Sequence, residues 1–359
     1  MEKRRLGTTN LYASPIGLGC RTIHKIGSKK AIEIIREAIK TGINLIDTAN
    51  IYGGGKSEEI VGEAIHDIRE KVILATKGGI VKDASGLPTQ DLSPKSVRKA
   101  VEESLKRLKT DYIDLYQIHY PDPTTPPKET VNTLMEYVDS GIIRHVGLSN
   151  ISYEELKEWA SLINIPSIQI PYNFLQHKTY DKILQFCQSR KISIIAYTPL
   201  LMGLLTEKVK RRFPRNDERS IIPPRIIKEC ERIVGQLKPI AEKCGKTVPQ
   251  LILNWLINRP GIGCILVGMS KIEHVKENVE AMEWRMPSEI RREIDDIAKG
   301  IKTSLDNEFF IQTIKKVFSN YAGRKVVILE MGMKIIVPST VEAGDRIKIS
   351  WNGEYLGKY

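Results

Sequence analysis

The feature that most constrains the fold of this chain is a strict alternation of short apolar runs with longer amphipathic runs. The apolar runs predict strands at 16–20, 43–47, 72–77, 112–118, 143–148, 166–170, 192–197 and 264–267. Apolar residues recurring at i, i+3, i+4 and i+7 predict helices near 28–41, 57–69, 93–108, 127–139, 152–163, 177–190, 225–244 and 271–281. Apolar strands that alternate with helices indicate an all-parallel sheet, and eight such units close into a (β/α)8 TIM barrel.

An open, doubly wound α/β sheet is the main alternative, and it usually carries a glycine-rich phosphate loop after its first strand. The sequence GLGCRT at 17–22 does not have the GxGxxG spacing, and GGGKSEE at 53–59 does not have the spacing of a P-loop. The barrel is therefore the favoured fold class. Turn residues at 8–10 predict a small N-terminal hairpin that closes the barrel floor.

Two stretches lie outside the alternation. Residues 206–224 are long, charged and rich in proline, so they could form either a flap over a bound ligand or a plain surface excursion. After residue 300 the apolar period changes to two, which predicts a small antiparallel β appendage. The expected domains are a barrel over 1–300, a linker helix over 301–320 and a β module over 321–359.

Composition excludes several classes of protein. No run approaches the ~18 apolar residues that a membrane helix needs, and no apolar core follows the N-terminal charges, so we expect a cytoplasmic protein. No CxxC or Cys/His cluster indicates a metal site or a disulfide framework among the cysteines, which are Cys20, Cys187, Cys230, Cys244 and Cys264. The net charge of +12 comes from Lys, Arg and Glu interleaved along helices, which favours solvated faces over a nucleic-acid surface. A positive field would also attract an anionic cofactor.

Four residues of unlike chemistry follow neighbouring predicted strands. Asp47 ends one strand, Tyr52 lies five positions later, Lys77 ends the next strand and His119 follows the one after. Since the carboxyl ends of barrel strands meet at one mouth, we expect these side chains to converge. A phenol has a pKa near 10, which a neighbouring ammonium lowers while a carboxylate holds that ammonium in place. Each residue alone would most often be structural, but together they predict a proton-donating site.

These residues lie in phrases that resemble the aldo-keto reductase family. The phrases follow the family's order through residues 1–298, and they are INLIDTANIYGGGKSEEIVGEAI, ILATKGG, DYIDLYQIHYPDP, IRHVGLSN, IIAYTPLLMGLLT and ILVGMSKIEHVKEN. The resemblance implies metal-free, reversible reduction of an aldehyde or ketone to an alcohol with NAD(P)H. It implies that Tyr52 donates the proton, that Lys77 paired with Asp47 lowers the pKa of Tyr52, and that His119 orients the carbonyl or assists the proton transfer.

The resemblance also implies cofactor contacts at matching positions. For the nicotinamide they are Ser149, Asn150, Gln169 and Tyr197; for the pyrophosphate, Thr198, Leu200 and Gly203; for the adenine, Glu277 and Asn278; for the 2′-phosphate of NADP, Gly268, Ser270, Lys271 and His274. NADP is favoured, because Lys271 can bind the 2′-phosphate as a point charge. NAD is the alternative, because lysine does not have the two-pronged guanidinium with which arginine binds a phosphate.

Two other function classes stay open at this stage. A regulatory or sensor protein could keep the barrel and its cofactor and use the C-terminal module for a partner. Residues 330–359 resemble the last strands of the OB-type C-terminal domain of bacterial elongation factor P, a fold that can bind nucleic acid. This tail carries Trp351 and scattered lysines rather than an aromatic and basic platform, so nucleic acid is not the favoured partner. We expect a small carbonyl substrate of undetermined identity and a monomer or small homo-oligomer.

Overall fold

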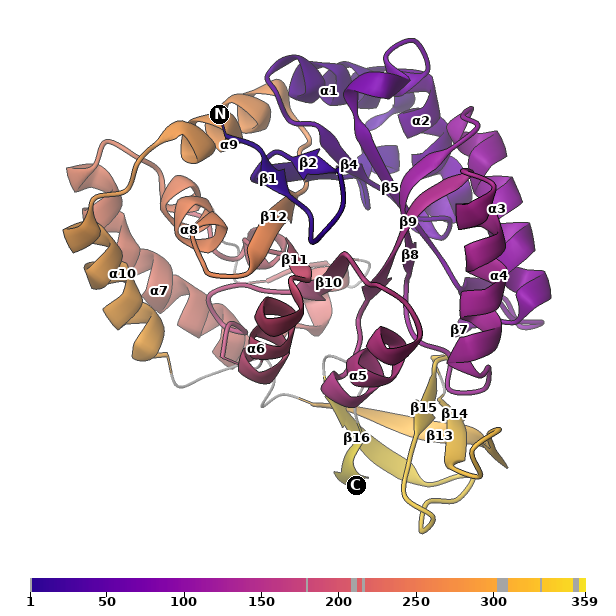
Figure 1. The fold of residues 1–359 in the computed structure, drawn as a ribbon. Helices are drawn as coiled ribbons and strands as arrows, with labels where there is room; N and C mark the ends of the chain where they lie inside the picture. Colours follow the sequence, from indigo (N-terminus) through magenta and orange to yellow (C-terminus); the bar gives the residue numbers. More distant parts are fainter. Residues whose placement is uncertain are drawn as a thin grey trace.

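The computed structural model describes residues 2–178, 180–207, 212–214, 217–301, 309–329, 331–350 and 355–359. Eight parallel strands in this part of the chain close into a barrel in the order β10-β11-β12-β3-β4-β5-β8-β9 (Figure 1). These strands are β3 (Ile16–Gly19), β4 (Leu45–Asp47), β5 (Ile73–Gly78), β8 (Ile113–Ile118), β9 (Ile143–Ser149), β10 (Ser167–Pro171), β11 (Ser193–Tyr197) and β12 (Ile262–Val267). The expected (β/α)8 barrel is thereby confirmed.

Helices surround the barrel, and most of them lie where the periodicity predicts them. The matching helices are α1 (Ser28–Lys40), α2 (Lys56–Ile65), α3 (Pro94–Leu108), α4 (Pro127–Asp139), α5 (Tyr153–Leu162), α6 (Asp181–Arg190), α7 (Pro224–Lys243) and α9 (Ile272–Glu283). Side chains cap the starts of two of these helices: Ser93 accepts a hydrogen bond from the backbone of Ser96, and Ser152 forms a capping box with Glu155.

Two further helices were not predicted. α8 (Val248–Ile257) is buried along its whole length, so its sequence is almost continuously apolar and has no 3.6-residue period for the pattern to reveal. α10 (Ser288–Lys299) does have an amphipathic pattern, but it lies beyond the last β/α unit, where the alternation predicts nothing.

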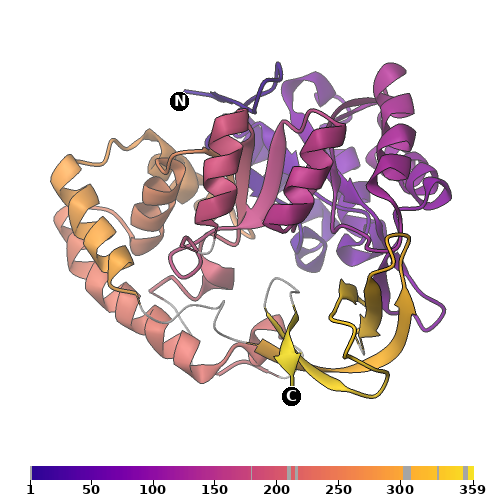
Figure 2. The ribbon, with the colours of Figure 1, turned by 60° about the horizontal axis from the view of Figure 1, so that its bottom comes forward.

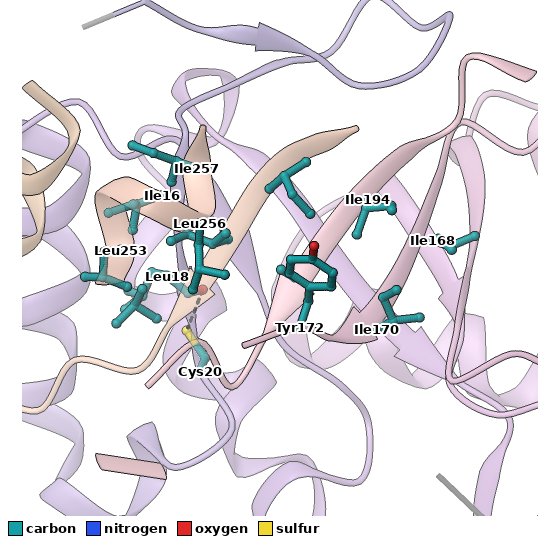
Figure 3. Packing of buried hydrophobic residues seen from close by; sticks show 14 of the residues in the cluster. Ile16, Leu18, Cys20, Ile168, Ile170, Tyr172, Ile194, Leu253, Leu256 and Ile257 are labelled. Carbon is teal, nitrogen blue, oxygen red and sulfur yellow. Dashed lines mark hydrogen bonds between the residues drawn. The ribbon is translucent and has the colours of Figure 1, made fainter. Parts of the chain in front are cut away.

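Alternate residues along the strands build two separate apolar layers, because successive side chains point to opposite faces. One set packs outward against the helices. Figure 3 shows Ile16 and Leu18 of β3 beside Leu253 and Leu256 of α8, with Cys20 buried at the end of the same row.

The other set points into the barrel and fills its lower half. This inner cluster contains Leu45, Ile73, Ala75, Leu115, Ile195, Cys264 and Leu266. The expected N-terminal hairpin is present as β1 (Arg4–Arg5) paired antiparallel with β2 (Tyr12–Ala13), and it places Leu6 and Leu11 against this cluster. The hairpin therefore closes the floor of the barrel with apolar side chains.

The C-terminal appendage is an antiparallel sheet with its own small core. Its described strands are β13 (Phe309–Ser319), β14 (Lys325–Leu329), β15 (Lys334–Ile336), β16 (Arg346–Ser350) and β17 (Tyr355–Lys358), in the order β15-β14-β13-β16-β17. Figure 2 shows this sheet at one end of the molecule and the N-terminal hairpin at the other. The sheet thus lies on the side of the barrel where the strands end.

The predicted linker helix over 301–320 is wrong over its second half. Residues 302–308 lie outside the described part of the chain, and residues 309–319 form strand β13. Apolar residues three apart, Ile314 and Val317, imitate a helical period there. However, β-branched and aromatic residues dominate the segment, and β13 pairs with β14 on one side and β16 on the other.

A second hairpin, β6 (Ile80–Lys82) with β7 (Pro88–Gln90), follows β5 and was not predicted.

Within the stretch 206–224, the structure describes a short 3-10 helix over Glu218–Ile221, while 208–211 and 215–216 lie outside the described residues. The proposed flap therefore stays a prediction. No helix among the described residues has both the length and the apolarity to cross a bilayer.

The floor hairpin generates a prediction about stability. Leu6 is fully buried in the inner cluster, so Leu6→Ala should lower the free energy of unfolding by about 2–5 kcal/mol through lost burial and an unfilled cavity. Urea unfolding monitored by circular dichroism measures this change. Tyr12→Ala on the same hairpin is the control, because Tyr12 is 52% exposed and should change stability little. Equal effects of the two substitutions would contradict the role of the hairpin as a floor.

Candidate active site

A polar layer lies directly above the inner apolar cluster. In each of three adjacent strands, an inward-facing apolar residue is followed two positions later by an inward-facing polar one. The pairs are Leu45 and Asp47, Ala75 and Lys77, and Leu115 and Gln117. Strand register places Asp47 opposite Ala75 and Lys77 opposite Gln117. The period of two thus puts a row of polar groups at the carboxyl ends of the strands, where barrels carry their active sites.

Lys77 and Asp47 form a buried ion pair at the centre of this layer. The Nζ of Lys77 lies 2.6 Å from Oδ2 of Asp47, and the two side chains are 1% and 4% exposed. Nζ also donates to the backbone oxygen of Thr48 at 2.9 Å. The other oxygen of Asp47 accepts hydrogen bonds from Gln169 at 2.8 Å and Gln117 at 3.1 Å. These partners satisfy both charges, which burial otherwise makes costly.

Tyr52 lies against this ion pair at the start of a short 3-10 helix (Tyr52–Gly55). The Nζ of Lys77 is 5.2 Å from the centre of the Tyr52 ring, and the imidazole of His119 meets the ring edge to face at 5.7 Å. Gly53 follows with a φ of +61°, and a Cβ there would come within 2.7 Å of His24. The turn that presents Tyr52 therefore requires glycine. The four residues predicted to form a proton-donating site do converge.

Burial and charge act in opposite directions on Tyr52. Burial raises the pKa of the Tyr52 hydroxyl, the positive charge of Lys77 lowers it, and the negative charge of Asp47 raises it; the net pKa is above its ordinary value. The expected effect of Lys77 is present, but the expected net lowering is not, because loss of hydration outweighs the neighbouring cation. Burial also acts to lower the pKa of Lys77, yet Asp47 and Tyr52 together hold it above its usual value.

His119 is held as a neutral imidazole. Burial, followed by the positive charges of Lys77 and Arg21, lowers its pKa well below the ordinary value. Its Nδ1 is buried and has no hydrogen-bond partner among the described residues. Its ring also stacks on that of Tyr120 at 5.5 Å. A neutral ring at this place can donate one hydrogen bond without adding a charge.

The residues predicted to hold the nicotinamide form a hydrogen-bonded group at the ends of β9, β10 and β11. Tyr197 donates to Oδ1 of Asn150 at 2.7 Å, and Nδ2 of Asn150 donates to the backbone oxygen of His119 at 2.9 Å. The hydroxyl of Ser149 donates to the backbone oxygen of Gln169 at 3.0 Å. This group is therefore fixed in place and tied directly to the proton-donating residues.

Unusual backbone geometry marks the same region. Non-glycine residues with positive φ include Asn150 at 51°, Thr198 at 52°, Leu201 at 47° and Met202 at 54°. Such conformations are uncommon for non-glycine residues and concentrate at functional sites. Thr198 and the turn Leu201–Gly203 follow β11, and the predicted pyrophosphate residues Leu200 and Gly203 are joined there by a 2.9 Å backbone hydrogen bond.

The predicted adenosine residues lie apart from the proton-donating group, after β12 and along α9. Gly268, Ser270 and Lys271 precede α9, and Lys271 is exposed. The backbone N–H of Ser270 points to Nδ1 of His274 at 3.5 Å. Glu277 accepts a 2.6 Å hydrogen bond from Thr247.

Next to Glu277, Nδ2 of Asn278 is buried and has no hydrogen-bond partner within the described residues. That unsatisfied donor fits an absent hydrogen-bonding ligand.

Two residues near the site were not predicted. Gln117 lies on the same strand face as Leu115 and could have been found from the period of two that ends at His119. Arg21 follows the first barrel strand, and its charge acts to lower the pKa of both Tyr52 and His119. No sequence pattern distinguishes Arg21 from other lysines and arginines of this basic chain.

The buried imidazole generates a prediction about pH. Because the pKa of His119 is lowered on folding, the unfolded state binds a proton below about pH 6.5 that the folded state does not. Lowering the pH from 7 to 5 should therefore cost up to about 2 kcal/mol of stability through this residue. His119→Asn should reduce the pH dependence by that amount in urea unfolding measured at both pH values. His66→Asn, at an exposed position, should keep the wild-type difference; an unchanged difference in His119→Asn would contradict a neutral His119.

Comparison with known proteins agrees with this geometry. Residues 15–299 match the sequence model of the Aldo/keto reductase family. Aldo-keto reductase YhdN of Bacillus subtilis is 37% identical over 314 residues, which cover 84% of this chain and 94% of the relative. The NADH-specific methylglyoxal reductase of Escherichia coli is 34% identical over 306 residues, which cover 79% and 94%.

Solved structures give the same result. The crystal structure of an aldo/keto reductase from Klebsiella pneumoniae in complex with NADP and acetate is similar with a TM-score of 0.66 at 25% identity. The similarity covers 85% of this chain and 98% of that one. The fold, the family match and the identity to YhdN together show that this chain belongs to the aldo/keto reductase family and is an oxidoreductase.

Proposed function

We propose that this protein reduces a small aldehyde or ketone to an alcohol with NADPH, and that Tyr52 donates the proton. The observation that carries this proposal is the buried Lys77, whose Nζ lies 2.6 Å from Asp47 and 5.2 Å from the ring of Tyr52. A buried ion pair is weak support for stability, since apolar residues of similar volume often serve as well. Its position against a phenol at the barrel mouth favours a chemical role.

The chemistry follows from the charge that develops on the substrate. A reduced nicotinamide, when bound by the residues at the ends of β9, β10 and β11, would supply the hydride that the carbonyl carbon accepts. Tyr52 gives its hydroxyl proton to the carbonyl oxygen, which would otherwise become an alkoxide, and the nearby ammonium of Lys77 stabilises the phenolate that remains. His119, neutral at working pH, donates a second hydrogen bond to the same oxygen. Asp47, fixed by Gln117 and Gln169, keeps Lys77 in place.

The net pKa of Tyr52 favours one direction of the reaction. Because this pKa is raised, the hydroxyl stays protonated through the neutral range and is available as an acid for reduction. Oxidation of an alcohol would need the phenolate as a base, and that form requires a higher pH. Reduction is therefore the direction we expect at neutral pH.

Several features of the chain support a bound dinucleotide. The left-handed backbone at Asn150, Thr198 and Met202 lies where the nicotinamide and pyrophosphate residues are expected. The unsatisfied Nδ2 of Asn278 lies where the adenine is expected. Lys271 lies at the N-terminus of α9, where helix N–H groups and a cation both favour a phosphate. The relatives differ in cofactor, since one is named NADH-specific and another binds NADP, so our preference for NADP depends on Lys271.

A first test removes the proposed proton donor. Tyr52→Phe should lower kcat by about 10²–10⁴-fold or more, because the variant has no proton to give, while the Kd for NADPH should stay near the wild-type value. NADPH oxidation over a panel of aldehydes that includes methylglyoxal measures the first quantity, and quenching of protein fluorescence measures the second. Tyr12→Phe, at an exposed position on the barrel floor, is the control.

Unchanged turnover in Tyr52→Phe would refute the role of Tyr52. Tight NADPH binding by the wild type without turnover of any carbonyl would instead favour a sensor on the same barrel.

A second test concerns the 2′-phosphate. Lys271→Ala should raise the Kd for NADPH by about tenfold or more, the usual scale for losing a hydrogen bond to a charged group, and leave the Kd for NADH unchanged. Fluorescence titration with each cofactor provides both values. Lys276→Ala, at an exposed position further along α9, is the matched control. Equal losses for the two cofactors would contradict a phosphate site at Lys271.

A further inference from the structure

The C-terminal sheet contacts two loops at the mouth of the barrel. One loop contains the hairpin β6–β7 and follows β5; the other, 120–126, follows β8 and begins directly after His119. Figures 1 and 2 both show the sheet beside the β6–β7 hairpin. The family match ends at residue 299, so it assigns no role to this sheet.

The first contact joins β15 to the hairpin through backbone atoms. The amide of Gln90 accepts from the backbone nitrogen of Lys334 at 2.8 Å and donates to the backbone oxygen of the same residue at 3.1 Å. Gln90 is buried. Nearby, Gly332 packs so closely that a Cβ would come within 2.6 Å of the backbone oxygen of Pro88. At this contact the sheet therefore packs directly against the hairpin.

The second contact supplies Asp122 with a counterion that no described residue of the barrel provides. Asp122 has a side chain only 1% exposed, and among the described residues Lys334 is the only cation that forms an ion pair with it, at 3.2 Å. Burial would raise the pKa of Asp122, but hydrogen bonds from Thr124 and the charge of Lys334 hold it below its ordinary value. A buried carboxylate without its cation is strongly unfavourable. The barrel thus contains an anion whose partner comes from the appended sheet.

Asp122 organises both loops around itself. Its Oδ1 accepts from the backbone nitrogen of Thr124 at 2.9 Å, and its Oδ2 accepts from the hydroxyl of Thr125 at 2.8 Å. Oδ2 also accepts from the backbone nitrogen of Leu92, which lies just after the hairpin, at 3.1 Å. Asn320 adds a 2.8 Å hydrogen bond from the sheet to the backbone oxygen of Pro123. The chain after His119 is therefore held by hydrogen bonds to one carboxylate, whose described counterion is Lys334.

We infer that the C-terminal sheet is a fixed wall of the substrate entrance, and that Lys334 is a positioning residue that acts through Asp122 on the segment 119–126. Its contacts reach the loops after β5 and β8, whereas the expected cofactor residues follow β9, β10, β11 and β12. Losing Lys334 should therefore weaken the use of the carbonyl substrate and spare the binding of the dinucleotide. The effect on the carbonyl depends on the proposed function, but the coupling of Lys334 to the loop does not.

The test compares Lys334→Met with Lys334→Arg in the full-length protein. Methionine keeps the length of the side chain and removes the charge, and arginine keeps the charge. In Lys334→Met, amide hydrogen exchange in peptides covering 119–126 and 80–92 should speed up by about tenfold or more, because Asp122 loses its counterion. The KM for methylglyoxal and for a bulkier aromatic aldehyde should rise by about tenfold, while the Kd for NADPH changes less than about twofold. Lys334→Arg should keep both the amide exchange and the KM close to their wild-type values.

Two further variants make the result specific. Lys316→Met, at an exposed position on β13, is the matched control and should behave as the wild type. Adding Asp122→Asn to Lys334→Met removes the unpaired charge and should recover part of the protection against exchange, a coupling that separate structural effects would not give.

Wild-type exchange in Lys334→Met would overturn the inference, as would a KM and an NADPH Kd that rise together, since both would show no specific link to the substrate loops. If the wild type reduces no carbonyl of the panel, the proposed function fails. The exchange data and the Asp122→Asn rescue still decide whether Lys334 positions this loop.

Discussion

The buried ion pair between Lys77 and Asp47 imposes a requirement that the rest of the mouth meets. Two charges without water need hydrogen bonds in the right directions, and the barrel provides them from four neighbouring or facing strands. Lys77 has Asp47 and the backbone of Thr48, while Asp47 also has Gln117 and Gln169. None of these groups can move without leaving another charge or amide unsatisfied. The pair therefore gives the site a single arrangement, into which Tyr52 and His119 fit from loops.

The period of two along the strands explains how such a polar layer is compatible with a stable core. The inward positions are apolar below, where the hairpin residues Leu6 and Leu11 exclude water, and polar only in the last layer. The boundary falls within single strands, so a shift of one residue would turn Asp47 or Lys77 toward the helices. Buried apolar residues such as Leu45 and Leu115 on the same strand face oppose that shift. The apolar floor thus fixes the strand register that places the polar residues at the mouth.

The sequence predicts correctly those features of the fold and the site that depend on local patterns. Period, turn chemistry and strand-end position predict the eight barrel strands, the N-terminal hairpin, and the convergence of Tyr52, Lys77, Asp47 and His119. Sequence reasoning failed where tertiary context decides. α8 is buried on every side and so has no polar face to reveal it, and β13 has a helical spacing but two strand neighbours.

The same limit applies to the electrostatics and to the docking of the sheet. Sequence predicted correctly that Lys77 lowers the pKa of Tyr52, but the larger effect of burial depends on how tightly the mouth closes around that hydroxyl. Likewise, Asp122 and Lys334 lie 212 positions apart, and no local pattern relates them. Asp122 alone suggests only a loop that caps itself through Thr124. Because Asp122 is buried, its negative charge favours a nearby cation. Lys334 provides that cation from the sheet that packs against the mouth. The appended sheet therefore belongs to the architecture of the site, because it supplies the counterion of the carboxylate that holds the chain beyond His119, and no described residue of the barrel forms an ion pair with that carboxylate.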